Sequence, residues 1–146
     1  MKILITGGCG YKGSVIIPTL LNEGHEVINV DTQWFGNHLK DHENLINKKG
    51  DIRNIDYELF KEVDSIIHLA NIANDPAVDL NPTLSWEVNV LASKLLADNA
   101  IKAGIKQIIY ASSGSVYGIK EEEKVTEDLD LIPISVYNKT KMVAER

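Results

Sequence analysis

Short apolar runs that alternate with segments of helical pattern constrain the fold of this chain more than any other feature. The runs predict strands at residues 2–6, 26–30, 45–50, 65–70 and 107–112. They are nearly continuous rather than alternating, which is typical of strands buried on both faces of a parallel sheet. Helical spacing and helix-stop residues predict helices at 14–23, 55–62, 84–103 and 135–146. The predicted fold class is α/β: a doubly wound, Rossmann-like parallel sheet with helices on both faces.

The segments between these elements carry their own signals. Residues 71–82, rich in Asn, Asp and Pro, and residues 114–134 predict connecting loops. Pro18 predicts a kink in the first helix, because its ring opposes an interior helical hydrogen bond. These predictions place every chemically interesting motif at the carboxyl end of a strand, where parallel sheets bind ligands.

Length and composition limit the class of protein further. The 146 residues predict one domain, residues 1–146, with a buried core. No apolar run reaches the roughly 18 residues of a membrane span. A net charge of −6 without a basic stripe disfavours nucleic acid as the main partner. Cys9 is the only cysteine, which excludes an internal disulfide and a cysteine-built metal site and fits a reducing cytoplasm. No metal site is predicted.

A glycine-rich loop directly follows the first predicted strand. Gly7, Gly10 and Gly13 form G-x-x-G-x-x-G at the start of the first predicted helix. One glycine permits a tight turn, one lets the backbone approach a pyrophosphate, and one lets the helix pack closely on the sheet. The helix amino terminus then offers free N–H groups and its positive dipole end to phosphates. The motif predicts a dinucleotide site, with a plain strand-to-helix turn as the alternative.

Asp31 favours the dinucleotide interpretation. It stands at the carboxyl end of the second predicted strand, where a carboxylate can accept hydrogen bonds from an adenosine ribose; the alternative is a turn residue. A carboxylate there repels a 2′-phosphate, so NAD is favoured over NADP. Lys12 departs from the usual pattern, since an apolar residue would pack better before the third glycine, and an exposed Lys12 that attracts phosphate would relax this preference. Cys9 is either a reactive thiol at a helix start or a small loop residue.

Tyr137 and Lys141 lie one helical turn apart in the last predicted helix, so both side chains fall on one face. A neighbouring ammonium and the positive nicotinamide of NAD⁺ both favour the phenolate and predict a lowered tyrosine pKa, as a general base requires. Ser113 follows the fifth predicted strand and can hydrogen-bond the hydroxyl that loses its proton. Taken singly, these residues are equally explained as a packing tyrosine, a solvated lysine and a strand-ending serine.

Taken together, the motifs resemble the extended short-chain dehydrogenase/reductases, specifically the NAD-dependent nucleotide-sugar epimerase/dehydratase group. The resembling segments occur in that family's order and span nearly the whole chain: TGGCGYKG (6–13), Asp31, GDI (50–52), HLA (68–70), NV (89–90), ASSGSVYG (111–118) and YNKTK (137–141). The resemblance implies NAD as cofactor and a nucleotide-sugar as substrate. It also implies a homodimer, because dimers in the family commonly pair helices that include the Tyr/Lys one.

The resemblance implies roles for individual residues. Ser113, Tyr137 and Lys141 match the family's catalytic serine and Y-x-x-x-K pair. The implied cofactor-binding residues are Gly7, Gly10, Tyr11, Lys12, Gly13, Asp31, Asp51, Ile52, Leu69, Ala70, Asn89, Tyr137 and Lys141. Dehydratases of the family usually carry a Thr-Asp-Glu type segment where this chain has SSGS, which favours an epimerase, a reductase or a decarboxylase.

Members of that family continue beyond the Tyr/Lys helix into a smaller domain that holds the nucleotide-sugar. We therefore expect this chain to be the amino-terminal, cofactor-binding part of such an enzyme, without its substrate domain and inactive alone. The predicted function of the parent protein is NAD-dependent nucleotide-sugar epimerase. The alternatives are a reductase or decarboxylase of the same family, or a non-catalytic NAD-binding regulatory module. An intact Ser113, Tyr137 and Lys141 set favours an enzyme, since a pure binding module has no use for the phenol.

Overall fold

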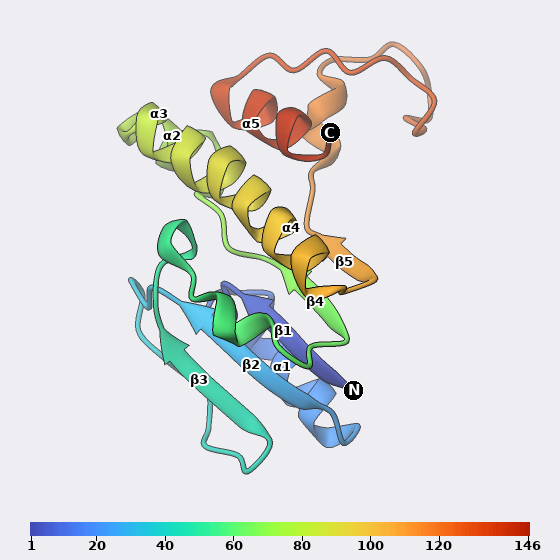
Figure 1. Ribbon diagram of the computed structural model, residues 1–146. Coiled ribbons are helices and arrows are strands. Elements are labelled where there is room, and N and C mark those ends of the chain that lie inside the picture. The colour runs from blue at the N-terminus through green and yellow to red at the C-terminus, as the bar shows by residue number, and fades with distance from the viewer.

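A computed structural model describes all residues 1–146 and shows an open, five-stranded sheet (Figure 1). The strands are β1 (Lys2–Thr6), β2 (Glu26–Asp31), β3 (Leu45–Lys49), β4 (Ser65–His68) and β5 (Gln107–Tyr110). They pair in parallel in the order β3-β2-β1-β4-β5. The strand order reverses between β1 and β4, which is the point where doubly wound sheets bind ligands. The predicted fold class and the five predicted strands are confirmed.

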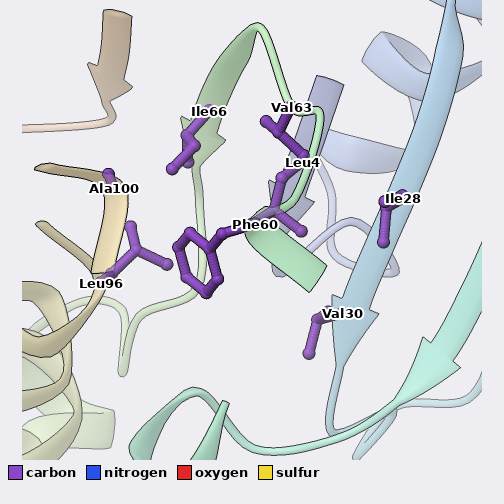
Figure 2. Packing of buried hydrophobic residues seen from close by; sticks show 8 residues of the cluster. All are labelled: Leu4, Ile28, Val30, Phe60, Val63, Ile66, Leu96 and Ala100. Atoms are coloured by element: carbon purple, nitrogen blue, oxygen red, sulfur yellow. The ribbon is translucent and has the colours of Figure 1, made fainter. Parts of the chain in front are cut away.

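One face of the sheet is covered by α4 (Ala92–Ala103) and the short 3-10 helix η2 (Tyr57–Phe60). Figure 2 shows the Phe60 ring among side chains of the strands and of α4. The cluster consists of Leu4, Ile28, Val30, Phe60, Val63, Ile66, Leu96 and Ala100. Phe60 is fully buried, and burial of such a side chain stabilises the fold by about 2 kcal/mol. This ring therefore joins η2, α4 and the sheet.

The opposite face is covered by α1 (Gly13–Asn22). Because successive strand side chains point to opposite faces, Ile3 and Ile5 of β1 pack against Ile17 and Leu21 of this helix. Pro18 lies inside α1 without ending it. The predicted covering of both faces by helices is confirmed, and the glycine loop is held between β1 and α1.

Within the segment predicted as a helix at 55–62 only the 3-10 turn η2 forms, and a second 3-10 turn, η1 (Ile52–Asn54), precedes it. Each turn begins at an aspartate whose carboxylate accepts a backbone N–H: Asp51 from Arg53, and Asp56 from Glu58. These local hydrogen bonds compete with those of an α-helix and break the segment into single turns. The prediction of a short helix there was therefore wrong in kind.

The segment before α4 also differs from the prediction. Residues 71–82 include α2 (Asp75–Leu80), and the predicted helix at 84–103 consists of α3 (Pro82–Trp86), the π-helix η3 (Glu87–Leu91) and α4. The Asn74 and Asn81 side chains each accept a backbone N–H in the following helix, and each helix has a proline in its first turn. Asparagine followed closely by proline therefore starts a helix here rather than forming a loop.

The carboxyl-terminal part of the chain places the last helix above the sheet. After β5, the 3-10 turn η4 (Gly114–Tyr117) and a long connection lead to α5 (Val136–Ala144). Ser135 Oγ caps α5 by accepting a 3.1 Å hydrogen bond from the Asn138 N–H. Helix α5 packs against η3, η4, α2 and α3 (Figure 1). None of the helices has the length and apolar character that a membrane crossing needs.

Candidate active site

A cleft of about 490 Å³ opens at the carboxyl ends of the strands. Its walls come from the β1–α1 loop, the ends of β2 and β4, the segment after β3, the residues after β5, and α5. The predicted site residues that line it are Gly7, Gly10, Tyr11, Lys12, Asp31, Asp51, Ile52, Leu69, Ala70, Tyr137 and Lys141. Residues from both ends of the chain thus meet in one cavity, at the edge of the sheet that the motifs indicated.

Gly7 has the tight-turn geometry that the first motif position requires. Its φ is 77°, and a Cβ atom there would lie 2.5 Å from the Ala70 nitrogen. Its N–H donates a 2.8 Å hydrogen bond to the Val30 carbonyl. The chain can pass between β2 and β4 at this point only because glycine has no side chain and tolerates a positive φ.

The other two motif glycines serve different purposes. Gly13 begins α1 and does not line the cleft, and a Cβ atom on it would clash with the backbone of Gly8. Gly10 lines the cleft, and a Cβ atom there would meet only the Gly7 carbonyl oxygen, at 3.3 Å. Gly13 therefore allows the helix to approach the loop, whereas Gly10 leaves the backbone beside the helix amino terminus open to a ligand.

Asp31 ends β2 and is bonded to the glycine loop. Its two carboxylate oxygens accept hydrogen bonds from the Cys9 N–H (2.9 Å) and the Gln33 N–H (2.6 Å). Each oxygen keeps a second lone pair that a ribose hydroxyl could use. Burial, and then the Asp31 charge, raise the pKa of the Cys9 thiol. The reactive-thiolate interpretation of Cys9 is therefore disfavoured.

Asp51 is held in the cleft wall by an arginine. The Arg53 guanidinium donates to the Asp51 carboxylate (Nη2–Oδ2, 2.7 Å) and to the Glu87 carboxylate of η3 (Nη1–Oε2, 2.9 Å). These Arg53 hydrogen bonds hold the pKa of Asp51 below its ordinary value. Arg53 and Glu87 were not predicted from the sequence, because a pair formed between segments so far apart in the chain leaves no local pattern.

Three exposed aromatic side chains rim the cleft: Tyr11 (95% exposed), Trp34 (58%) and Phe35 (88%). Trp34 and Phe35 follow Gln33, whose φ of 57° turns the chain after β2. Rings beside a ligand cleft offer a surface on which a nucleobase can stack. Two adjacent aromatic residues shortly after a predicted strand end are the sequence signal for such a surface.

Lys141 is almost fully buried, with 3% exposure, and its side chain reaches the end of β5. Its Nζ donates a 2.8 Å hydrogen bond to the Ala111 carbonyl. Burial, and then the charge of Lys12, lower the pKa of Lys141 to about 8. The lysine can therefore exchange a proton close to neutral pH.

Tyr137 lies half-buried on the same helix, and its pKa differs in direction from the prediction. Burial raises the pKa of the phenol; Ser113 acts in the opposite direction, and the Asp75 carboxylate adds to the rise. Ser113 does not line the cleft, and its hydroxyl lies 2.7 Å from the Ser115 hydroxyl. For the chain without NAD⁺, the prediction that the pKa of Tyr137 is lowered is therefore wrong. Helical spacing placed Lys141 and Tyr137 on one helix face but could not show that burial would dominate.

Asn89 is buried in η3 behind the cleft wall rather than lining it. Its amide accepts a 2.8 Å hydrogen bond from the Ile72 N–H and donates to the Ile72 carbonyl (3.1 Å) and to Thr140 Oγ1 (3.1 Å). Thr140 in turn donates to the Tyr137 carbonyl (2.7 Å). Asn89 therefore ties the cleft wall to the helix that carries Tyr137 and Lys141.

His68 forms a second buried connection. Its Nδ1 lies 2.6 Å from Thr6 Oγ1 of β1, and its Nε2 lies 2.8 Å from Ser93 Oγ of α4. Burial, and then the charge of Lys141, lower the pKa of His68 to about 4, so its ring is neutral at pH 7. No group of three or more His, Cys, Asp or Glu side chains forms a candidate metal site. His68 therefore bonds β1 to α4 as a neutral side chain.

The sequence matches the NAD-dependent epimerase/dehydratase family over residues 3–146. It is 29% identical to UDP-glucose 4-epimerase of Lactobacillus helveticus over 100% of this chain and 46% of that protein. It is 34% identical to UDP-glucuronic acid decarboxylase 1 of Danio rerio over 99% of this chain and 36% of that protein. Among solved structures, UDP-N-acetylglucosamine 4-epimerase from Methanobrevibacter ruminantium M1, in complex with UDP-N-acetylmuramic acid, matches with a TM-score of 0.93 and 30% identity, over 99% of this chain and 48% of that one. The chain thus spans about half the length, or less, of these proteins.

Proposed function

Because the chain belongs to the NAD-dependent epimerase/dehydratase family, we propose that it supplies the NAD site and the proton-transferring residues of a nucleotide-sugar epimerase. One observation carries this proposal: Tyr137 and Lys141 line the same cleft as the glycine loop and Asp31. A helix that served only for packing would not need to present a phenol and a buried ammonium to a nucleotide-sized cavity.

The residues of the cleft fit NAD. The open backbone at Gly10, beside the amino terminus of α1, suits the pyrophosphate. Asp31 keeps lone pairs for the adenosine ribose and would repel a 2′-phosphate. Asp51 and Ile52 would hold the adenine, and Lys141 the nicotinamide ribose. When bound, NAD accepts and returns the hydride that an epimerisation requires.

Three side chains of this chain would handle the proton. Tyr137 would take it from a sugar hydroxyl onto its phenolic oxygen and later give it back. Because burial raises the pKa of Tyr137, its phenolate needs positive charge in the site, and protonated Lys141 would supply it. The Ser113 hydroxyl would hydrogen-bond the sugar oxygen as negative charge develops there. Binding, orientation and proton transfer are thereby assigned to separate groups.

The segment after β5 favours epimerisation over dehydration. It reads Ser112, Ser113, Gly114 and Ser115 and carries no acidic side chain. Eliminating water requires a further acid and base beside the sugar, which serines do not supply. The similarity to a UDP-glucuronic acid decarboxylase makes decarboxylation the second candidate, since that reaction begins with the same removal of a proton and a hydride.

The cofactor proposal is tested by titrating the chain with NAD and with NADP, followed by calorimetry and by tryptophan fluorescence, because Trp34 lines the cleft. We expect NAD to bind more tightly than NADP. Asp31→Asn should weaken NAD binding about tenfold, as the loss of one charge-assisted hydrogen bond predicts. Equal affinity for the two dinucleotides in the wild-type chain would contradict the assigned role of Asp31.

The reaction proposal is tested by activity assays with UDP-sugars. Epimerisation of a UDP-sugar would be followed by NMR, and carbon dioxide release from UDP-glucuronic acid would be assayed in parallel. Tyr137→Phe should lower kcat by about a hundredfold or more, as the loss of a general base predicts. Tyr57→Phe, which lies outside the cleft, is the matched control. Undiminished turnover of the Tyr137→Phe variant would remove the proposed base.

We also propose that the protein forms a homodimer through the surface of η3, α4 and α5. Leu91 and Leu95 lie one helical turn apart and are 63% and 36% exposed, and Val143 of α5 is 39% exposed. Burying such exposed apolar side chains against a second copy of the chain would favour association. Light scattering after size-exclusion chromatography should give a dimer for the wild-type protein and a monomer for Leu91→Lys. A monomeric wild-type protein would contradict the proposal.

A further inference from the structure

We infer that Tyr110 is a positioning residue for Lys141, and that the face of its ring holds the lysine ammonium in the cleft. Lys141 Nζ lies 4.6 Å from the centroid of the Tyr110 ring. The same ammonium donates to the carbonyl of the next residue, Ala111, at 2.8 Å. Two consecutive residues at the end of β5 therefore contact the lysine, one through a carbonyl and one through an aromatic ring.

The Tyr110 ring compensates for hydrogen-bond and ion-pair partners that the Lys141 ammonium lacks. An ammonium has three donors, and the only hydrogen bond that Lys141 Nζ makes within the protein goes to Ala111. None of the ion pairs of the protein includes Lys141. A charge buried with so few partners is unfavourable. The negative face of an aromatic ring attracts a cation most strongly where water is excluded, which is the situation of this lysine.

The hydroxyl of Tyr110 does not explain why a tyrosine stands at this position. That oxygen is buried and has no hydrogen-bond partner. The ring itself packs against His68, with 5.5 Å between ring centroids. His68 is anchored in turn by hydrogen bonds to Thr6 and Ser93. The part of Tyr110 with defined neighbours is therefore the ring, between a fixed imidazole and the ammonium.

Other charged and titratable groups also act on Lys141. Lys12, from the glycine loop, disfavours the protonated lysine, and Glu145, at the end of α5, favours it. Tyr137 lies on the same helix, and His68 is close enough for its own pKa to be lowered by the lysine charge. The Tyr110 ring and Glu145 thus both favour the protonated form of Lys141. The catalytic importance of this contact rests on the proposed function, but the contact itself does not.

The chain contains a matched control. Lys102 Nζ lies 4.3 Å from the centroid of the Tyr57 ring, a similar geometry, but Lys102 is exposed to solvent. Water already stabilises that ammonium, so the Tyr57 ring should contribute little to it. The two pairs therefore separate the effect of the ring from the effect of burial.

The test is an NMR titration of the lysine side chains in the chain labelled with ¹³C-lysine, with the Lys141 signal assigned by its loss in Lys141→Met. Tyr110→Phe keeps the ring and removes only the unpartnered hydroxyl, so the pKa of Lys141 should stay close to its wild-type value. Tyr110→Leu removes the ring and should lower that pKa by about one pH unit. Tyr57→Leu, which removes the ring of the solvent-exposed pair, should leave the pKa of Lys141 unchanged.

If Tyr110→Leu does not fold, fluorinated phenylalanines placed at position 110 provide the same test with an unchanged ring shape. Each added fluorine weakens the negative ring face, so the pKa of Lys141 should fall stepwise from phenylalanine to trifluorophenylalanine. An unchanged Lys141 pKa along this series, or an equal fall in Tyr110→Phe and Tyr110→Leu, would overturn the inference. The readout needs neither cofactor nor substrate, so its failure is distinguishable from a failure of the proposed function.

Discussion

The glycine loop and the end of α5 line the same cleft but are built in opposite ways. In the loop, the close backbone contacts of Gly7 and Gly13 both shape the site and pack the fold. At α5, Lys141 presents a buried ammonium that the fold would be more stable without. Stability and the proposed function therefore coincide in the wall formed by the glycine loop and oppose each other in the wall formed by α5.

Gly7→Ala should destabilise the protein by about 4 kcal/mol, because it combines a strained positive φ with a clash against the Ala70 backbone. Gly104→Ala is its control: Gly104 has a φ of 76° but no neighbouring atom within 4 Å of the added Cβ. Strain alone should cost about 1 kcal/mol there. Urea denaturation of both variants gives the difference, which measures close packing. Equal losses in the two variants would show that packing contributes nothing at Gly7.

Acid should weaken the connection that His68 makes between β1 and α4. Its pKa is lowered from 6.5 to about 4 in the folded protein. Between these values the unfolded chain binds a proton that the folded protein does not. The contribution of His68 to the free energy of unfolding is therefore fully present above about pH 6.5. It decreases as the pH falls, by about 3 kcal/mol at pH 4. Other groups also titrate in this range, so the measurement is the difference in urea denaturation between the wild type and His68→Gln from pH 7 to pH 4. A variant with the same acid dependence as the wild type would contradict the prediction.

Lys141→Met should abolish proton transfer yet stabilise the fold by about 2 kcal/mol at pH 7, because an apolar side chain of similar length replaces a buried ammonium. The pKa of Lys141 is lowered from 10.5 to about 8. Below pH 8 Lys141 is protonated in the folded protein, so the full unfavourable free energy of burying its charge applies. As the pH rises from 8 to 10.5 the folded protein loses the proton first, so the advantage of the variant should disappear. Thermal unfolding at pH 7 and pH 10 checks this. A variant less stable than the wild type at pH 7 would show that the buried ammonium of Lys141 does not destabilise the fold.

Arg53→Lys should cost about 1 kcal/mol, because a lysine cannot reproduce the planar fork that contacts Asp51 and Glu87 together. The pair is partly exposed, which limits the effect. Lys94→Ala, which removes the exposed pair with Asp98 on α4, is the control and should cost about 0.3 kcal/mol. Equal effects, measured by urea denaturation, would mean that the Arg53 bridge adds nothing beyond an ordinary surface ion pair.

Much of the architecture could be predicted from local patterns. Apolar runs indicated the five strands, and the glycine spacing with Asp31 indicated where the cleft would form. The errors arose where side chains cap the backbone: Asn74 and Asn81 start helices in a segment that looked like a loop, and Asp56 starts a single 3-10 turn in a segment predicted as a helix. Capping depends on the conformation of a single residue, which periodicity does not report.

Spacing along the chain is enough to predict which residues share a strand end or a helix face, because those relations are local. The burial, the pKa values and the partners of these residues arise from the packing of the folded chain. It buries Lys141 and raises the pKa of Tyr137 rather than lowering it. It moves Asn89 behind the cleft wall, joins Arg53 to Glu87, and places the Tyr110 ring against the ammonium. These outcomes depend on desolvation and on contacts between distant segments, and neither is encoded in local spacing.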